Sequence, residues 1–199
     1  MRLATRSSAV PILYRYLFPA MWLSWAAYWW VSSRNVKSAV RRESLASHVS
    51  HIGPLILAAL LLSVPSIPVP ILGQRFLPRA AWLLGIAATL TAAGLLVTVW
   101  ARQYLGTNWS ATVTIKEGHE LITRGPYALV RHPIYTGLLL AFAGSAMAVG
   151  EWRGVLAVAL AFLALWRKLL LEERWMHQEF GEVYQAYCRR VPALIPFVV

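Results

Sequence analysis

The segment 125–137, Gly-Pro-Tyr-Ala-Leu-Val-Arg-His-Pro-Ile-Tyr-Thr-Gly, concentrates residues that could do chemistry. It holds an arginine, a histidine and two tyrosines, and a long apolar run begins inside it. Pro133 disfavours a helical conformation at His132 and suits the first position of the helix that follows. Arg131 and His132 are therefore predicted at a helix N-terminus, where backbone amides and the helix dipole attract anions.

A second pair of charged residues, Glu172 and Glu173, follows the last apolar run. Adjacent carboxylates at a membrane boundary are costly unless cations or water compensate them. One interpretation is structural: the apolar helix meets solvent there, and the acids pair with Arg167 or Lys168. The other interpretation is functional, with one carboxylate facing inward to hold a cation.

The other candidates also have structural interpretations when each is taken alone. Arginine before an apolar helix is ordinary in membrane topology, and Tyr127 and Tyr135 could belong to an interfacial aromatic belt. Tyr184 and Tyr187 are most simply the apolar face of an amphipathic helix lying on the membrane. Taken together, however, the two charged clusters are complementary. The cluster of Arg131 and His132 offers groups that bind anions, and the cluster of Glu172 and Glu173 offers anionic groups. A zwitterionic ligand with a further positive centre, such as S-adenosylmethionine, would match both.

Two other site classes are not predicted. A metal centre is not indicated, because only His and Glu are available as ligands and no His-Glu-x-x-His spacing is present. The single cysteine, Cys188, excludes an intramolecular disulfide framework and a cysteine-based zinc site. A serine hydrolase is not indicated either, because the sequence has no Gly-x-Ser-x-Gly motif.

The composition indicates a membrane protein. The 199 residues are 58% hydrophobic, include ten tryptophans and carry a formal charge of +11, which is too apolar for an ordinary soluble domain. Because Lys and Arg flank the apolar runs, the basic excess indicates loops near an anionic leaflet rather than nucleic-acid binding. The first apolar run is long and lacks a small-residue cleavage site, so it is predicted to be a retained span.

The apolar runs predict an all-α integral membrane protein with about five transmembrane helices. The predicted spans are 11–31, 51–72, 80–100, 134–149 and 155–171. Prolines in the second span predict a kinked or irregular end, and small residues in the third predict close packing. The last two spans should form an antiparallel hairpin, with the fifth continuing as a polar helix to about Arg190. The polar segment 101–133 includes a short extended stretch, 112–115.

The distribution of basic residues predicts the orientation. With the N-terminus outside, the cytoplasmic segments hold thirteen Lys and Arg residues and the outside segments hold six. This asymmetry predicts the N-terminus out and the C-terminus in, with both charged clusters on the cytoplasmic side. The chain is divided into an N-terminal three-span region, 1–100, and a core, 101–199, that holds the loop, the hairpin and the C-terminal helix.

Three motifs in this order resemble the isoprenylcysteine carboxyl methyltransferase family. They are the segment 125–137, then Glu172-Glu173, and then Phe-Gly-Glu-x-Tyr-x₂-Tyr-x₃-Val-Pro-x₃-Pro-Phe over 180–197. The resemblance covers about residues 100–197. It implies an integral-membrane enzyme that binds S-adenosylmethionine without a Rossmann-like fold, in a pocket formed by the cytoplasmic loop, the last two spans and the C-terminal helix.

The resemblance also implies roles for individual residues. Lys168 stands where the family has an arginine. Arg131 and Lys168 are the candidate catalytic residues, and one or both would hold the acceptor. The implied cofactor-binding residues are His119, Glu120, Leu121, Ile122, Tyr127, His132, Pro133, Ile134, Tyr135 and Glu172.

The implied reaction is methyl transfer to a membrane-embedded lipidic acceptor, most simply the carboxylate of an isoprenylcysteine. Such a carboxylate is already a nucleophile at neutral pH, so no strong general base is required. Phospholipid N-methyltransferase, an NADPH-dependent membrane reductase and a non-enzymatic membrane protein are the alternatives. Because eukaryotic members have more spans, this chain resembles a prokaryotic form, in the cytoplasmic membrane with its site facing the cytoplasm. The sequence leaves the acceptor and the oligomeric state open.

Overall fold

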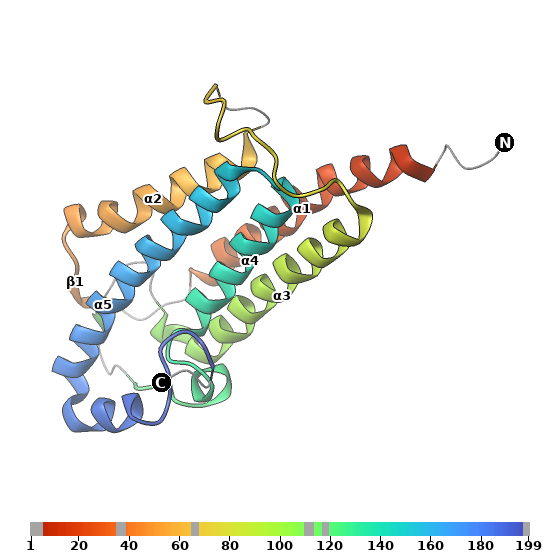
Figure 1. Ribbon diagram of the computed structural model, residues 1–199. Helices are drawn as coiled ribbons and strands as arrows, with labels where there is room; N and C mark the ends of the chain where they lie inside the picture. The colour runs from red at the N-terminus through yellow and green to blue at the C-terminus, as the bar shows by residue number, and fades with distance from the viewer. Residues whose placement is uncertain (1–5, 35–38, 65–67, 110–113, 117–119, 197–199) are drawn as a thin grey trace.

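Helices dominate the computed structural model, which describes residues 6–34, 39–64, 68–109, 114–116 and 120–196 (Figure 1). Within those residues the long helices are α1 (Arg6–Ser32), α2 (Leu45–Ser63), α3 (Ala81–Leu105), α4 (Pro133–Val149) and α5 (Trp152–Cys188). Two short 3₁₀ helices, η1 (Gly106–Asn108) and η2 (Gly125–Ala128), and two strands, β1 (Ala39–Arg42) and β2 (Thr114–Lys116), complete the elements. The predicted all-α class is confirmed, with one small antiparallel ribbon added.

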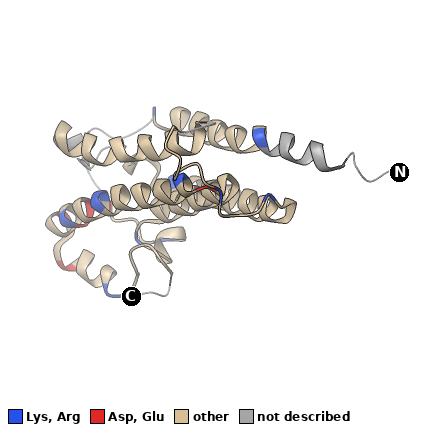
Figure 2. Cartoon of the chain, turned by 45° about the horizontal axis from the view of Figure 1, so that its top comes forward, with Lys and Arg blue, Asp and Glu red and all other residues tan. Residues whose placement is uncertain are grey.

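The helices have the length and composition of membrane spans. Among the described residues, α2, α3 with its extension to Asn108, and α5 are long and apolar enough to cross a bilayer, and α4 is a shorter apolar helix. Neither α2 nor α4 contains Lys, Arg, Asp or Glu, and most of the ribbon in Figure 2 is tan, the colour of residues other than these four. The chain is therefore an all-α integral membrane protein, while five crossings and the N-out orientation stay predictions.

The second predicted span, 51–72, differs from helix α2 at both ends. The second helix begins at Leu45 rather than residue 51, because the Ser44 side chain accepts a hydrogen bond from the Ser47 amide at 3.2 Å and caps it. It ends at Ser63 rather than residue 72, so Pro54 is its only proline and the prolines beyond residue 64 lie outside it. The predicted extended stretch overlaps β2, and its first residues, 112 and 113, lie outside the described residues.

The predicted close packing of the third helix is confirmed at its interface with α4. A Cβ atom added to Gly137 would lie 2.5 Å from the carbonyl oxygen of Gly94, and one added to Gly144 would lie 2.6 Å from Thr91 Oγ1. Glycines thus let the two backbones approach closely, as in helix pairs within membranes. The other helices pack around this pair, with α5 against α2 and α4, and α1 against α3.

Gly94→Ala is expected to lower the melting temperature of the detergent-solubilised protein. The new Cβ would clash with the backbone of Gly137 and Ala141, and overpacking of this kind costs about 1–3 kcal/mol. For a chain of this size that is a fall of roughly 2–12 °C. Gly53→Ala in α2 is the matched control, since nothing lies within 4 Å of its added Cβ. Equal melting temperatures for the two variants would contradict the packing argument.

The hairpin of α4 and α5 forms as predicted, and a bend in α5 then returns the chain to the start of α4 (Figure 1). Gly150 closes the hairpin with φ 64°, and Gly181 interrupts α5 with φ 51° and ψ −123°, a conformation that glycine adopts readily. After α5, the carbonyl groups of Pro192 and Ala193 accept hydrogen bonds from the amides of Arg131 and His132, at 2.8 and 3.0 Å. The C-terminal segment is thereby fixed against the motif that precedes α4.

Candidate active site

A cavity of about 320 Å³ lies at the end of the bundle where α4 begins and where the apolar part of α5 ends. Nearly all the site residues predicted from the sequence line it: Glu120, Leu121, Ile122, Tyr127, Arg131, His132, Ile134, Tyr135, Lys168 and Glu172. Pro133 is instead buried beside it as the first residue of α4. His119 lies outside the described residues.

His132 is held between the two carboxylates of α5. Its Nδ1 lies 3.6 Å from Glu172 Oε2 and its Nε2 lies 3.2 Å from Glu173 Oε1. The imidazole is buried, and it stacks on the Tyr135 ring at a centroid distance of 5.3 Å. The predicted convergence of the two distant charged clusters is therefore confirmed.

Glu173 is the carboxylate that pairs within the protein. Its Oε1 accepts hydrogen bonds from Arg131 Nε at 2.8 Å and Arg131 Nη2 at 2.6 Å. Arg131 Nη1 donates to the carbonyl oxygens of Val191 at 2.5 Å and Cys188 at 3.3 Å. Arg131 thus joins the start of α4, the polar part of α5 and the segment after α5, so most of its donors already have partners.

Glu172 is the carboxylate that faces the cavity. It lines the wall, whereas Glu173 does not belong to the lining. Lys168, one helical turn earlier, places its Nζ 3.9 Å from Glu172 Oε1 and 5.6 Å from the centre of the Tyr135 ring. Glu172 therefore faces inward and pairs with Lys168, whereas Glu173 pairs with Arg131 and His132 rather than with Arg167 or Lys168. That Glu172 holds a cationic ligand stays a prediction.

Aromatic side chains form much of the remaining wall, and the sequence assigned several of them elsewhere. Tyr184 and Tyr187 are 2% and 4% exposed and line the cavity, rather than lying on a membrane surface as their spacing suggested. The hydroxyl of Tyr187 donates a hydrogen bond to the Tyr127 carbonyl oxygen at 2.5 Å. Their spacing of three residues marked a shared helix face, but it could not show which partner that face meets.

The N-terminal helices also contribute to the wall, which the sequence did not indicate. Trp25 and Trp29 of α1 and Ile52 and Leu55 of α2 line the cavity, together with Leu105, Asn108 and Trp109 after α3. Trp25 is anchored by a hydrogen bond from its Nε1 to Thr98 Oγ1 at 2.7 Å. The pocket is therefore enclosed by all five long helices, and not only by the loop, the last two spans and the C-terminal helix.

The charged groups shift the pKa of His132, which lies just outside α4. Burial alone would lower this pKa, but the neighbouring Glu172 and Glu173 raise it above its ordinary value of 6.5. A group whose pKa is higher in the folded than in the unfolded state stabilises the fold when it is protonated. This stabilisation is complete at pH values below the pKa of the unfolded state, and it is lost as the pH rises through the pKa of the folded state. Burial also raises the pKa of Tyr127 well above 10.0, so its phenol stays neutral.

The stability difference between the wild type and His132→Asn is accordingly expected to depend on pH. The wild type should have the larger advantage at about pH 6, where the imidazole is charged in both states, and the advantage should shrink at alkaline pH. Melting temperatures measured across this range in one detergent would test it. A difference that stays constant or grows with pH would show that the charged imidazole does not stabilise the fold.

The fold and the site define a class: an all-α membrane protein with a charged, aromatic-lined cavity at one end of its bundle. Comparison with known proteins makes this more specific. The model of the family described as phospholipid methyltransferase matches residues 82–183, which run from the start of α3 into the C-terminal part of α5. The chain belongs to this family, which includes the isoprenylcysteine carboxyl methyltransferases that its motifs resemble.

Individual relatives agree with this assignment. The chain is 30% identical to protein-S-isoprenylcysteine O-methyltransferase B of Arabidopsis thaliana over 59% of its length, and 34% identical to protein-S-isoprenylcysteine O-methyltransferase of Schizosaccharomyces pombe over 47%. It is 46% identical to methanethiol S-methyltransferase 2 of Bradyrhizobium diazoefficiens over 35%. The matched regions span 61%, 41% and 26% of those relatives.

Proposed function

We propose that this protein transfers a methyl group from S-adenosylmethionine to an anionic acceptor with an apolar body, of which an isoprenylcysteine carboxylate is the simplest example. The observation that carries the proposal is the pairing of Glu172 and Lys168 on the wall of one aromatic-lined cavity. Such a wall offers an acidic group for a ligand ammonium and a basic group for an acceptor anion, next to apolar surface.

The cavity residues fit the proposed cofactor. Its volume of about 320 Å³ is within the range of small-molecule sites. Tyr127, Tyr184 and Tyr187 offer flat apolar surface for a purine ring. The amide of Asn108 lines the cavity, and its Oδ1 has no hydrogen-bond partner among the described residues, so it is available to accept one from a bound ligand.

The residues would perform the reaction mainly by alignment. S-adenosylmethionine supplies an electrophilic methyl group when it is bound. Glu172 would hold the cofactor ammonium, and His132 would keep that carboxylate in position from behind. The tyrosines would exclude water, which strengthens the charge interactions within the site. No proton has to move for a carboxylate acceptor, so the site needs no general base and gains its rate from positioning.

Lys168 is the residue that we assign to the acceptor. Arg131 was the other candidate from the sequence, but its guanidinium is already bound to Glu173 and to two carbonyl oxygens. A lysine ammonium binds an anion as a point charge, without the two-pronged geometry of an arginine. It also disfavours a cationic acceptor, which argues against the amine of a phospholipid head group.

A thiol is the second candidate acceptor, because one relative is named methanethiol S-methyltransferase. A thiolate is an anion that Lys168 would stabilise in the same way as a carboxylate. The two acceptors differ in one requirement, since a thiol near neutral pH has to lose a proton before it attacks. The methyl-transfer rate should therefore rise with pH for a thiol and stay flat for a carboxylate.

The proposal is tested by methyl incorporation from labelled S-adenosylmethionine into three acceptors: a farnesylcysteine acid, a small alkyl thiol and phosphatidylethanolamine. We expect the acid to be methylated, and Lys168→Gln to raise its KM by about 10–100-fold, the scale of one lost charged hydrogen bond. Lys168→Arg, which keeps the charge, should recover most of the loss. Transfer to phosphatidylethanolamine alone, or equal KM values for the wild type, Lys168→Gln and Lys168→Arg, would refute the assignment.

A further inference from the structure

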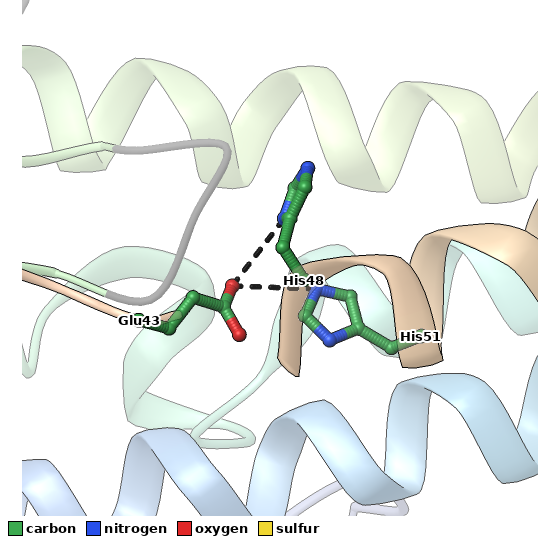
Figure 3. A group of neighbouring side chains, drawn as sticks. All are labelled: Glu43, His48 and His51. Atoms are coloured by element: carbon green, nitrogen blue, oxygen red, sulfur yellow. Dashed lines mark hydrogen bonds and ion pairs between the residues drawn. The ribbon is translucent and has the colours of Figure 1, made fainter. Parts of the chain in front are cut away.

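A second cluster of ligand-type side chains, separate from the cavity wall, lies where β1 leads into α2. The carboxylate of Glu43 faces two imidazoles, with 3.4 Å from its Oε1 to His48 Nδ1 and 3.5 Å from the same oxygen to His51 Nε2 (Figure 3). One ligand atom from each of the three residues lies within 4.8 Å of the others. Two imidazoles and one carboxylate form a frequent protein ligand set for zinc.

His51 gives an independent reason to expect a ligand there. Its side chain is fully buried, and neither ring nitrogen has a hydrogen-bond partner in the part of the chain that the structure describes. A buried polar group without a hydrogen-bond partner is rare, and a bound ion is one of its regular explanations. The His51 Nε2 atom, which lies 3.5 Å from Glu43 Oε1, is a potential ligand atom for a cation.

The spacing of the ligand atoms fits a tetrahedral ion. With zinc-to-ligand distances of about 2.0–2.1 Å, two ligand atoms of a tetrahedral site lie about 3.3 Å apart. The distances of 3.4 and 3.5 Å are close to that value. Ligand atoms at right angles, as in an octahedral site with the same bond lengths, would lie about 2.9 Å apart. These two distances are therefore compatible with a tetrahedral zinc ion.

The local sequence explains why these residues meet. Ser44 caps α2 and fixes the chain direction between Glu43 and the first helical turn. His48 and His51 are three residues apart on α2 and so share a face of that helix. Arg167 of α5 donates a hydrogen bond from Nη1 to the Ser47 carbonyl oxygen at 3.3 Å, which brings α5 against this turn. The resulting pattern, Glu-x₄-His-x₂-His, differs from the spacing sought in the sequence.

We propose that Glu43, His48 and His51 bind one zinc ion, with a fourth position left for water. The ion would join the end of β1 to the start of α2. The start of α2 is also part of the cavity, because Ile52 directly follows His51 and lines the cavity wall together with Leu55. A bound ion would accordingly hold the α2 side of the cavity in place.

Zinc content and affinity test this inference on the full-length protein, purified in detergent with a tag that does not bind metal. We expect one zinc per chain by elemental mass spectrometry after dialysis, and a melting temperature that falls when a chelator removes the metal. Replacing that zinc with Co²⁺ should give the intense visible absorption of a tetrahedral site.

The variants His48→Ala and Glu43→Gln should each weaken zinc binding by more than about 100-fold, the upper end for loss of an outer partner. His48 is only partly buried, so its variant should still fold, which circular dichroism and size-exclusion chromatography would verify. His177→Ala, on α5 and outside the cluster, is the matched control and should keep its zinc. Absence of zinc from the wild type at micromolar free metal, iron in its place, or unchanged affinity in both variants would overturn the proposal.

Discussion

Replacing Glu172 by Gln is expected to weaken the binding of S-adenosylhomocysteine by about 10–100-fold, the effect of losing a charged hydrogen bond in a buried site. S-adenosylhomocysteine, the product left after methyl transfer, keeps the ammonium that Glu172 is proposed to hold. Gln keeps the shape of the side chain but removes its charge, while the Lys168 ammonium stays nearby. Isothermal titration of the detergent-solubilised variant would measure the change.

Glu179→Gln provides the control for this experiment, because Glu179 lies on the same helix, is exposed and is not part of the cavity wall. It should leave the affinity unchanged. His132→Ala should weaken binding together with Glu172→Gln, since the imidazole supports that carboxylate. Unaltered affinity in both variants would remove the pair from the cofactor site and leave the cavity without its proposed acidic group.

Replacing Glu173 by Gln should have a large effect of a different kind, on stability. The change leaves the half-buried guanidinium of Arg131 without its charge partner, and breaking a buried ion pair on one side costs about 3 kcal/mol or more. For a chain of this length we expect the melting temperature to fall by roughly 6–12 °C. Glu182→Gln, at an exposed position of the same helix, should change it little.

A double-mutant cycle separates the ion pair from other effects of the substitution. Arg131→Met combined with Glu173→Gln removes both charges, so the double variant should lose less stability than the sum of the two single losses. The affinity of Glu173→Gln for S-adenosylhomocysteine should change less than that of Glu172→Gln. Both affinities are measured at a temperature at which all variants are folded. Additive stability losses would mean that Arg131 acts through its carbonyl contacts with Cys188 and Val191 rather than through Glu173.

The two adjacent glutamates illustrate the limit of the sequence at this site. Consecutive residues on a helix point about 100° apart, so only one of Glu172 and Glu173 can face a given cavity. The sequence shows that the pair ends an apolar run, but not how that helix is rotated against α4. The packing of α5 on α4 sets this rotation, and it turns Glu172 to the cavity and Glu173 to Arg131.

The sequence by itself determined the membrane class, the approximate positions of the helices and the start of α4 at Pro133, because apolar runs and proline geometry act locally along the chain. It also identified ten of the residues that line the cavity, through motifs that resemble one family. Only the tertiary structure decided that Trp25 and Trp29 close the cavity, which of the two glutamates faces it, and that His51 is buried beside Glu43. These features depend on helix rotation and on contacts between distant segments, which no local pattern encodes.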